Sequence, residues 1–137
     1  MVLPSNEGNT MDWKLELIAV PVSDIDRAKD FYVKVGFTAD HDHTVSDEVR
    51  FVQLTPPGSA CSIVLDLNFS PMAPGSVKGL QCVVKDAAAA RDFLLSVGVD
   101  ASPIDDQQWG TFVHFADPDG NEWTLQQLPE WSPSYQA

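Results

Sequence analysis

The feature that most constrains this chain is an internal repeat. When the sequence is shifted by 62 residues, the stretch 22–39 aligns with 84–101 without a gap, and eight of the 18 aligned pairs are identical. Chance alone would produce about one identity over that length. A further match follows at a shift of 61, for the pairs Phe51/Phe112, Val52/Val113 and Pro57/Pro118. An internal repeat of this length predicts two copies of one supersecondary unit.

The first copy has the pattern of a strand, a helix and three more strands. The aliphatic run Leu15–Val22 predicts the first strand. Asp24 stands where a helix N-cap belongs, and Gly36 stands where a left-handed C-cap belongs. Three further strands are expected at 38–43, 48–55 and 61–67, with a turn at 56–58.

The second copy repeats this order. Gly79–Val84 predicts a strand, and Ala87–Val97 predicts a helix that Gly98 ends. Strands are then expected at 99–104, 110–116 and 122–128, the last two joined by a hairpin turn at 117–120. Each copy is therefore βαβββ, and the fold class is α+β.

The length of 137 residues suits a single domain, and an apolar content of 44% is enough for a packed core. We expect that domain to span residues 12–130, with modules at about 14–67 and 78–128. Residues 1–11 and 131–137 are expected to be flexible ends.

Two motifs resemble a known family. The stretch VSDIDRAKDFYVKVGF in the first module and FADPDGNEWTLQQ in the second are similar to the glyoxalase/bleomycin-resistance/dioxygenase (vicinal-oxygen-chelate) superfamily. The resemblance covers nearly all of residues 14–128. It implies that the two modules form curved sheets around a cleft, and that the chain is a homodimer, since many members build their clefts between subunits. A shared fold does not imply a shared reaction.

The resemblance also implies where a metal would bind. Metalloenzymes of the family place up to four ligands, usually His and Glu, on the first and last strands of each module. Aligning the motifs puts these positions at Leu17, Ser62, Gly79 and Thr124. Divalent metals need imidazole, thiolate or carboxylate donors, which none of these residues has. We therefore expect no metal and no cofactor at the family position.

Strand alternation, starting from those four positions, predicts which side chains line the cleft. Glutamine amides there can hydrogen-bond a ligand, and phenylalanine rings can stack on a planar one. Trp109, together with Trp13, is expected near the mouth of the cleft. The predicted ligand-binding residues are Leu17, Phe51, Gln53, Ser62, Asp66, Gln81, Trp109, Phe112, His114, Glu122, Thr124 and Gln126.

These residues favour a protein that binds an aromatic or cationic antibiotic-like small molecule in its cleft, as a sequestering resistance protein does. The alternative is a metal-independent isomerase or lyase-type enzyme in which His114 and Glu122, the one cleft pair with acid–base potential, are catalytic. A third hypothesis is a metalloenzyme with displaced ligands, Asp66, His114 and Glu122. A purely structural role is the fourth.

Two other pairs receive a structural interpretation. His41 and His43 alternate with aspartates, which predicts a solvated polar edge strand rather than a metal site. Cys61 and Cys82 are expected on the helix-facing side of their strands, buried and unreactive.

Charge and hydropathy exclude other classes of partner. Twenty acidic against eight basic residues give a net charge of −12, which repels phosphate backbones and makes nucleic acid a poor partner. No run approaches the length of a membrane span, and Met1–Thr10 does not resemble a secretory signal. With only two cysteines, a cytoplasmic protein with reduced thiols is expected.

Overall fold

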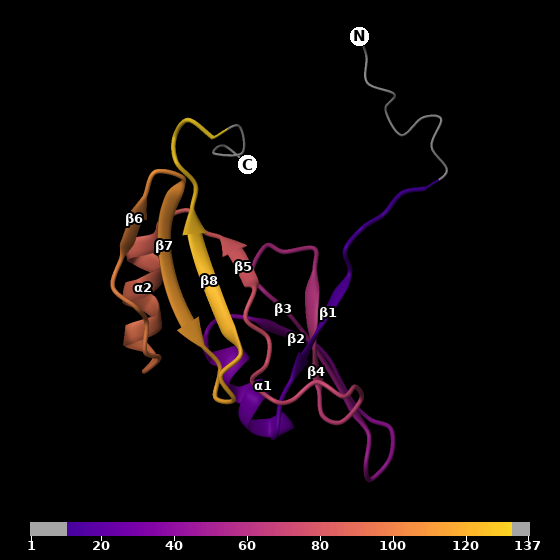
Figure 1. Cartoon of the computed structure of the whole chain (residues 1–137). Coiled ribbons are helices and arrows are strands. Elements are labelled where there is room, and N and C mark those ends of the chain that lie inside the picture. The colour runs from indigo at the N-terminus through magenta and orange to yellow at the C-terminus, as the bar shows by residue number, and fades with distance from the viewer. Residues whose placement is uncertain (1–10, 133–137) are drawn as a thin grey trace.

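The computed structural model describes residues 11–132 of the chain. The first module comprises β1 (Leu17–Pro21), α1 (Ile25–Lys34), β2 (Thr38–Thr44), β3 (Arg50–Thr55) and β4 (Ser62–Asp66). The second comprises β5 (Leu80–Val83), α2 (Ala87–Ser96), β6 (Asp105–Gln107), β7 (Gly110–Ala116) and β8 (Glu122–Gln127). The predicted α+β fold with two tandem βαβββ modules is confirmed (Figure 1). The expected flexible ends, 1–11 and 131–137, lie almost wholly outside the described residues.

Each module forms its own four-stranded sheet. Sheet A has the strand order β1-β4-β3-β2, and sheet B has the order β5-β8-β7-β6. The first and last strands of each module pair in parallel, and the remaining neighbours pair antiparallel. This leaves β1 and β5 as edge strands of their sheets.

The repeated helix signals are confirmed in both modules. The Asp24 carboxylate accepts a hydrogen bond from Arg27 N at 3.0 Å, and the Asp86 carboxylate accepts one from Ala89 N at 3.0 Å. Both therefore cap a helix whose first N–H groups have no partner within the helix. Gly36 and Gly98, just past the helix ends, have φ of 109° and 83°, which side chains with a Cβ rarely adopt.

One predicted strand is wrong. Residues 99–104 are not a strand, and the third strand of the second module is instead the short β6, Asp105–Gln107. The preceding chain meets β7 at Ser102, whose N–H donates to His114 O at 2.9 Å. Pro103 follows at once and has no N–H to continue a ladder. Strand pairing with β7 therefore begins only at Asp105, which lies opposite Phe112.

The two modules share one hydrophobic core, and α1 lies at its centre. Phe31 contacts Phe115 of sheet B at 6.2 Å between ring centroids, and Tyr32 contacts Trp123 at 5.8 Å. The same core includes buried residues from sheet A, such as Val52. Figure 1 shows α1 at the base between the two sheets. Neither ten-residue helix of the described range is long and apolar enough to cross a bilayer.

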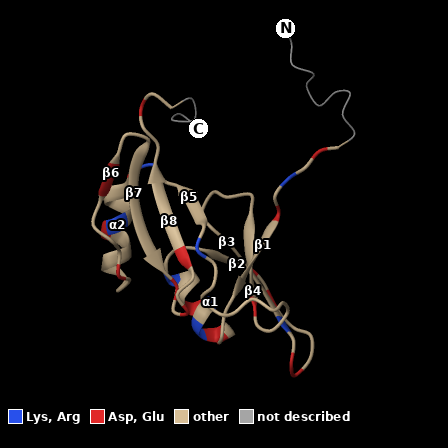
Figure 2. Ribbon diagram, viewed as in Figure 1, with Lys and Arg blue, Asp and Glu red and all other residues tan. Residues whose placement is uncertain are grey.

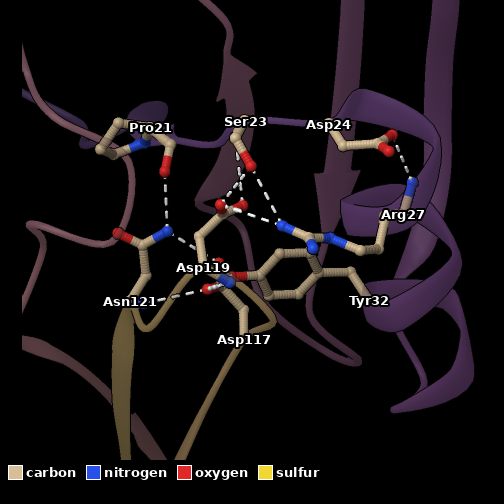
Figure 3. Close-up of polar contacts among 8 residues, drawn as sticks. All are labelled: Pro21, Ser23, Asp24, Arg27, Tyr32, Asp117, Asp119 and Asn121. Atoms are coloured by element: carbon tan, nitrogen blue, oxygen red, sulfur yellow. Dashed lines mark hydrogen bonds and ion pairs between the residues drawn. The ribbon is translucent and has the colours of Figure 1, made fainter.

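A buried polar cluster joins the turn between β7 and β8 to the first module (Figure 3). The Asp117 carboxylate accepts hydrogen bonds from Tyr32 OH at 2.7 Å and from Asn121 Nδ2 at 2.8 Å. Asn121 Nδ2 also donates to Pro21 O at 2.8 Å. Burial, followed by the nearby Asp117 charge, raises the pKa of Tyr32 well above its usual value. We call Tyr32, Asp117 and Asn121 the buried latch.

Polar contacts on the surface beside the buried latch also join the two modules. Ser23 Oγ donates to the Asp119 carboxylate at 2.5 Å, and Arg27 forms an ion pair with the same carboxylate at 3.1 Å (Figure 3). The predicted hairpin turn at 117–120 is confirmed, with Gly120 N donating to Asp117 O at 2.9 Å. The turn therefore closes the hairpin and also positions the two modules.

Candidate functional site

The orientation of the shared core determines where the predicted cleft residues lie. Phe115 and Trp123 point from sheet B into the core, and Val52 points into it from sheet A. Because side chains alternate along a strand, the residues between them point the opposite way. We call these the outer face of sheet A and the outer face of sheet B. Within one chain the two outer faces are therefore turned away from each other.

The outer face of sheet B carries a row of hydrogen-bonded polar groups. Gln81 Nε2 donates to Gln126 Oε1 at 2.7 Å, and Gln126 Nε2 donates to Trp109 O at 3.0 Å. His114 Nδ1 and Thr124 Oγ1 are 2.9 Å apart, within hydrogen-bonding distance. These contacts cross between strands, so these side chains share one face, as the alternation predicted. The row holds the amides in fixed positions while leaving Gln81 exposed to solvent.

Aromatic surface lies beside this row. The rings of Phe112 and His114 are parallel, with an interplanar angle of 1° and centroids 6.5 Å apart. Trp109 lies in the turn between β6 and β7 with 56% of its surface exposed. Phe112 is itself buried, with 9% of its surface exposed, so the flat surface that the outer face of sheet B offers next to the amide groups is that of His114 and Trp109. Flat rings next to amides are typical of small-molecule sites.

The outer face of sheet A carries both apolar and polar side chains. Leu17 lies opposite Ser62 between β1 and β4, and Gln53 lies opposite Val64 between β3 and β4. Phe51, two residues before Gln53, is half-buried on the same face. These predicted residues share one face of one sheet, and Ser62 among them lines a cavity together with Gln81 of the row on sheet B.

The outer face of sheet A holds further residues that the sequence did not place there. Thr55 Oγ1 lies 2.6 Å from Ser62 Oγ, so a second hydroxyl accompanies Ser62. His41 and His43 lie opposite Gln53 and Phe51, which puts both imidazoles on the outer face of sheet A. They lie on the exposed edge strand β2, as expected, but only the strand register, which includes a bulge after Ala39, could reveal which face they share.

Asp66 has a structural partner that the sequence did not indicate. Its buried carboxylate accepts hydrogen bonds from Phe69 N at 2.7 Å and from Ser70 Oγ at 2.5 Å. Both oxygens are thereby engaged in holding the segment that follows β4. The displaced metal set of Asp66, His114 and Glu122 therefore does not come together, because Asp66 is on sheet A and the other two are on sheet B.

His114 and Glu122 line one cavity of about 510 Å³ beside β7 and β8, together with Lys34 at the end of α1 and Asp100 of the loop after α2. No hydrogen bond joins His114 to Glu122 among residues 11–132. The histidine contacts Thr124, and the Glu122 carboxylate lies 3.7 Å from Lys78 Nζ on the surface. The two groups therefore share a cavity without forming a hydrogen-bonded acid–base pair.

A metal of the family type does not fit the four aligned positions. Ser62 and Thr124 offer neutral hydroxyls that already contact Thr55 and His114. Leu17 and Gly79 have no donor atom at all. Within residues 11–132, no group of three or more His, Cys, Asp or Glu side chains is arranged to hold a metal ion. No chemical step is therefore derived through a metal.

The twelve predicted ligand-binding residues do not gather in one cavity of a single chain. Ser62 and Gln81 line a cavity of about 280 Å³ where the edges of β1 and β5 approach each other. Cys61 and Cys82 line the same cavity and are half-buried. Burial raises the pKa of the Cys82 thiol, which favours the unreactive protonated form.

The strongest charge network lies away from the outer faces. The Asp42 carboxylate is bridged by Arg50 at 2.7 Å and by Lys29 at 2.6 Å. Hydrogen bonds from these two cations hold the pKa of Asp42 well below its usual value. Other acidic residues remain spread over the surface, including the start of β8, β6 and the region around α1 (Figure 2).

Comparison with known proteins identifies relatives that cover nearly the whole fold. The sequence profile of the Glyoxalase/Bleomycin resistance protein/Dioxygenase superfamily matches residues 14–125. An uncharacterized protein of Bacillus subtilis, YetH, is 31% identical over 115 residues, which are 80% of this chain and 94% of the relative.

Two solved structures from Streptomyces sp. CB03234 share both sequence and fold. TnmS3, described as an antibiotic binding protein, has 37% identity and a TM-score of 0.81, covering 88% of this chain and 100% of that one. A glyoxalase/bleomycin resistance protein has 39% identity and a TM-score of 0.74, covering 83% and 100%. This chain therefore belongs to the glyoxalase/bleomycin resistance protein/dioxygenase superfamily.

Proposed function

We propose that this protein binds a small, planar, antibiotic-like molecule in a cleft that two copies of the chain build together. The outer face of sheet A from one copy and the outer face of sheet B from the other form the two walls. The ligand is held by stacking and amide hydrogen bonds, without covalent chemistry. Such a protein confers resistance by sequestration.

The observation that carries the proposal is the row on the outer face of sheet B. The amides of Gln81 and Gln126 are ordered by hydrogen bonds of 2.7 and 3.0 Å, and parallel Phe112 and His114 rings lie beside them. Groups that are already ordered lose little conformational entropy when a ligand binds. Flat apolar surface next to fixed amides suits an aromatic molecule that carries carbonyl or hydroxyl groups.

The outward orientation of both faces supports a homodimer. Within residues 11–132 the two faces approach each other only where Ser62 and Gln81 line one cavity, because one hydrophobic core, with α1 at its centre, separates the rest of them. Both faces also end at unpaired edge strands, β1 and β5. A two-fold contact that joins these edges would place sheet A of each copy beside sheet B of the other.

The comparison with TnmS3 supports the ligand class. That protein, described as antibiotic binding, shares 37% identity with this chain over 88% of its length. The acidic surface, with a net charge of −12, favours a ligand with a positive charge. Of the predicted residues, Glu122 offers an exposed carboxylate on the outer face of sheet B.

The enzyme hypothesis receives less support from the geometry. General acid–base catalysis by His114 and Glu122 needs the two groups to reach one substrate atom, and each has a different partner here. His114→Ala separates the two functions. A binding protein keeps measurable affinity after this change, whereas a catalyst that uses His114 loses about 10²–10⁴-fold in rate.

A cytoplasmic location remains part of the proposal. It is supported by Cys61 and Cys82, which are both unpaired thiols in the described structure. Thiol titration of protein taken directly from cells, before and after reduction, tests whether both thiols are reduced there, in which case the two counts should agree.

The test of the proposal is a binding screen by isothermal titration calorimetry with planar aromatic antibiotics. Daunorubicin, which is cationic, and its neutral N-acetyl derivative form a matched pair for the charge preference. We expect binding at micromolar level or tighter for at least one planar compound, with Gln126→Ala weakening it about tenfold. Gln108→Ala, an exposed amide in the turn before β7, is the control and should leave the affinity unchanged. If no compound of the panel binds below about 1 mM, the proposed function is rejected.

A further inference from the structure

The two helices of the repeat carry equivalent apolar faces, and only one of these faces is covered. Ala28, Phe31 and Tyr32 of α1 are all buried in the shared core. At a shift of 62 residues, their counterparts on α2 are Ala90, Phe93 and Leu94. Phe93 is 46% exposed and Ala90 is half-buried. The face of α2 that corresponds to the covered face of α1 therefore remains partly open to solvent.

This open face of α2 lines a groove of about 350 Å³ between the two modules. The first module contributes Val35, Phe37 and the Pro56-Pro57 turn to the lining. Phe115 and Leu125 of sheet B also line the groove, from the side of the sheet opposite its outer face. Small-molecule sites have volumes of this order and are lined mainly by apolar side chains. We call this cavity the α2 groove.

Of the described residues that line the α2 groove, Lys85 alone carries a charge. Its ammonium group makes no hydrogen bond, ion pair or aromatic ring contact with any residue within 11–132. The other seven of the eight basic residues each contact a carboxylate, a backbone carbonyl or an aromatic ring. Lys85 is therefore available to a negatively charged group from outside the chain.

The charges around Lys85 restrict the kind of ligand that fits. Asp86, the next residue, uses its carboxylate to accept a hydrogen bond from Ala89 N at 3.0 Å and does not line the groove. The net charge of −12 repels small anions, although salt screens this repulsion over about 8 Å under physiological conditions. An anion gains enough to bind here only if it also removes apolar surface from water. The ligand must therefore combine a negative group with an apolar body.

We propose that the α2 groove binds an apolar carboxylate of the medium-chain fatty acid class. The hydrocarbon chain lies between the two modules and covers Phe93, as Phe115 covers Phe31 in the core. The carboxylate accepts a charge-assisted hydrogen bond from the Lys85 ammonium. This site is separate from the proposed cleft and does not rest on it, because α2 and the core side of sheet B line the groove.

The direct test is isothermal titration calorimetry of the full-length protein with octanoate and with octan-1-ol. The two probes share one chain length, and only octanoate carries a charge. We expect octanoate to bind once per chain with a dissociation constant below about 1 mM, and octan-1-ol to bind about tenfold more weakly. Equal affinity for the two probes would contradict the role assigned to Lys85.

Two pairs of variants locate the bound octanoate. Lys85→Gln should weaken octanoate binding about tenfold, whereas Lys78→Gln, at an exposed lysine beside Glu122 and outside the groove, should leave it unchanged. Ala90→Trp fills the groove and should abolish binding, whereas Ala88→Trp, at an exposed position of the same helix, should not. Circular dichroism checks the folding of all four variants.

The remaining outcomes separate the α2 groove from other occupants and from the cleft. If octanoate does not bind below about 1 mM, or binds Lys85→Gln as well as the parent, the proposal is wrong. If sedimentation shows that Ala90→Trp, but not Ala88→Trp, dissociates a dimer of the parent, a second copy covers the groove and the proposal is also wrong. His114→Trp, which fills the outer face of sheet B, should abolish antibiotic binding and leave octanoate binding intact. Loss of octanoate binding in that variant would place octanoate in the cleft and overturn the assignment.

Discussion

The two helices of the repeat begin alike and end in different environments. Asp24 and Asp86 cap them in the same way, and Phe31 and Phe93 occupy equivalent positions. Phe31 is 8% exposed in the shared core, whereas Phe93 is 46% exposed on the surface. The difference does not come from helix propensity or capping. It comes from the residues that each helix meets in the opposite module. For α1 these form the buried latch, whereas beside α2 Val35, Phe37 and the Pro56-Pro57 turn line an open cavity.

The largest expected difference is between alanine substitutions at the two equivalent phenylalanines. Phe31→Ala removes a buried ring from the contact with Phe115 and should lower the free energy of unfolding by about 4 kcal/mol. Phe93→Ala should lower it by only about 1 kcal/mol, because nearly half of that side chain is already in solvent. Urea unfolding monitored by circular dichroism measures both. Equal losses would mean that α1 is not the central helix.

The second comparison concerns Asn121 and its repeat image, Ser59. Asn121→Ala leaves Pro21 O, Val77 N and part of the Asp117 carboxylate without their buried partner, and should cost about 3 kcal/mol. The Ser59 side chain makes hydrogen bonds to Cys61 in an exposed turn, so Ser59→Ala should cost less than about 1 kcal/mol. The same unfolding assay applies. A mild Asn121→Ala variant would show that the buried latch does not join the modules.

Tyr32→Phe tests the latch without removing the ring. It leaves Trp123 Nε1 without an acceptor and Asp117 without one donor, and should cost about 2 kcal/mol at pH 7. Because the pKa of Tyr32 is raised in the folded state, its contribution is present below pH 10 and is lost as the pH rises further. The parent protein should therefore lose stability above pH 10 more steeply than the Phe variant. Parallel curves for the two would argue against a buried hydroxyl.

The smallest expected effect belongs to Asp42, in the exposed network with Arg50 and Lys29. Its pKa is lowered in the folded state, so its contribution is present at pH 7 and is lost as the pH falls below about 4, the usual value. Asp42→Asn should be slightly destabilised at pH 7, and the gap to the parent should narrow at pH 3, because the folded-state carboxyl is protonated only at still lower pH. Thermal unfolding at both pH values measures the gap, and a gap that widens in acid contradicts the assignment.

The sequence predicted the local structure well because the signals are local. The caps at Asp24 and Asp86, the glycines that follow both helices and the turn at 117–120 each depend on a few neighbouring residues. The repeat then transferred each assignment from one module to the other. Strand alternation similarly predicted that Gln81, Thr124 and Gln126 share a face.

What the sequence did not predict depends on distant residues. Pro103 accounts locally for the end of pairing after Ser102, but the hydrogen bond from Ser102 N to His114 O depends on a distant residue. The repeat is symmetric, so it gives no reason for α1 rather than α2 to occupy the centre of the core. The engagement of Asp66 by residues 69 and 70 likewise depends on how the chain leaves β4. The position of each outer face within the molecule therefore had to come from the structure.

The most direct test of the central claim is a complementation experiment on ligand binding. Gln53→Trp fills the outer face of sheet A, and His114→Trp fills that of sheet B, both at positions with solvent access. Each variant alone should form dimers that bind no ligand. After the two are mixed, unfolded and refolded, about one quarter of all sites should bind again, because each mixed dimer has one site with both walls intact. If binding does not return in the mixture although mixed dimers form, the site lies within a single chain and the account is wrong.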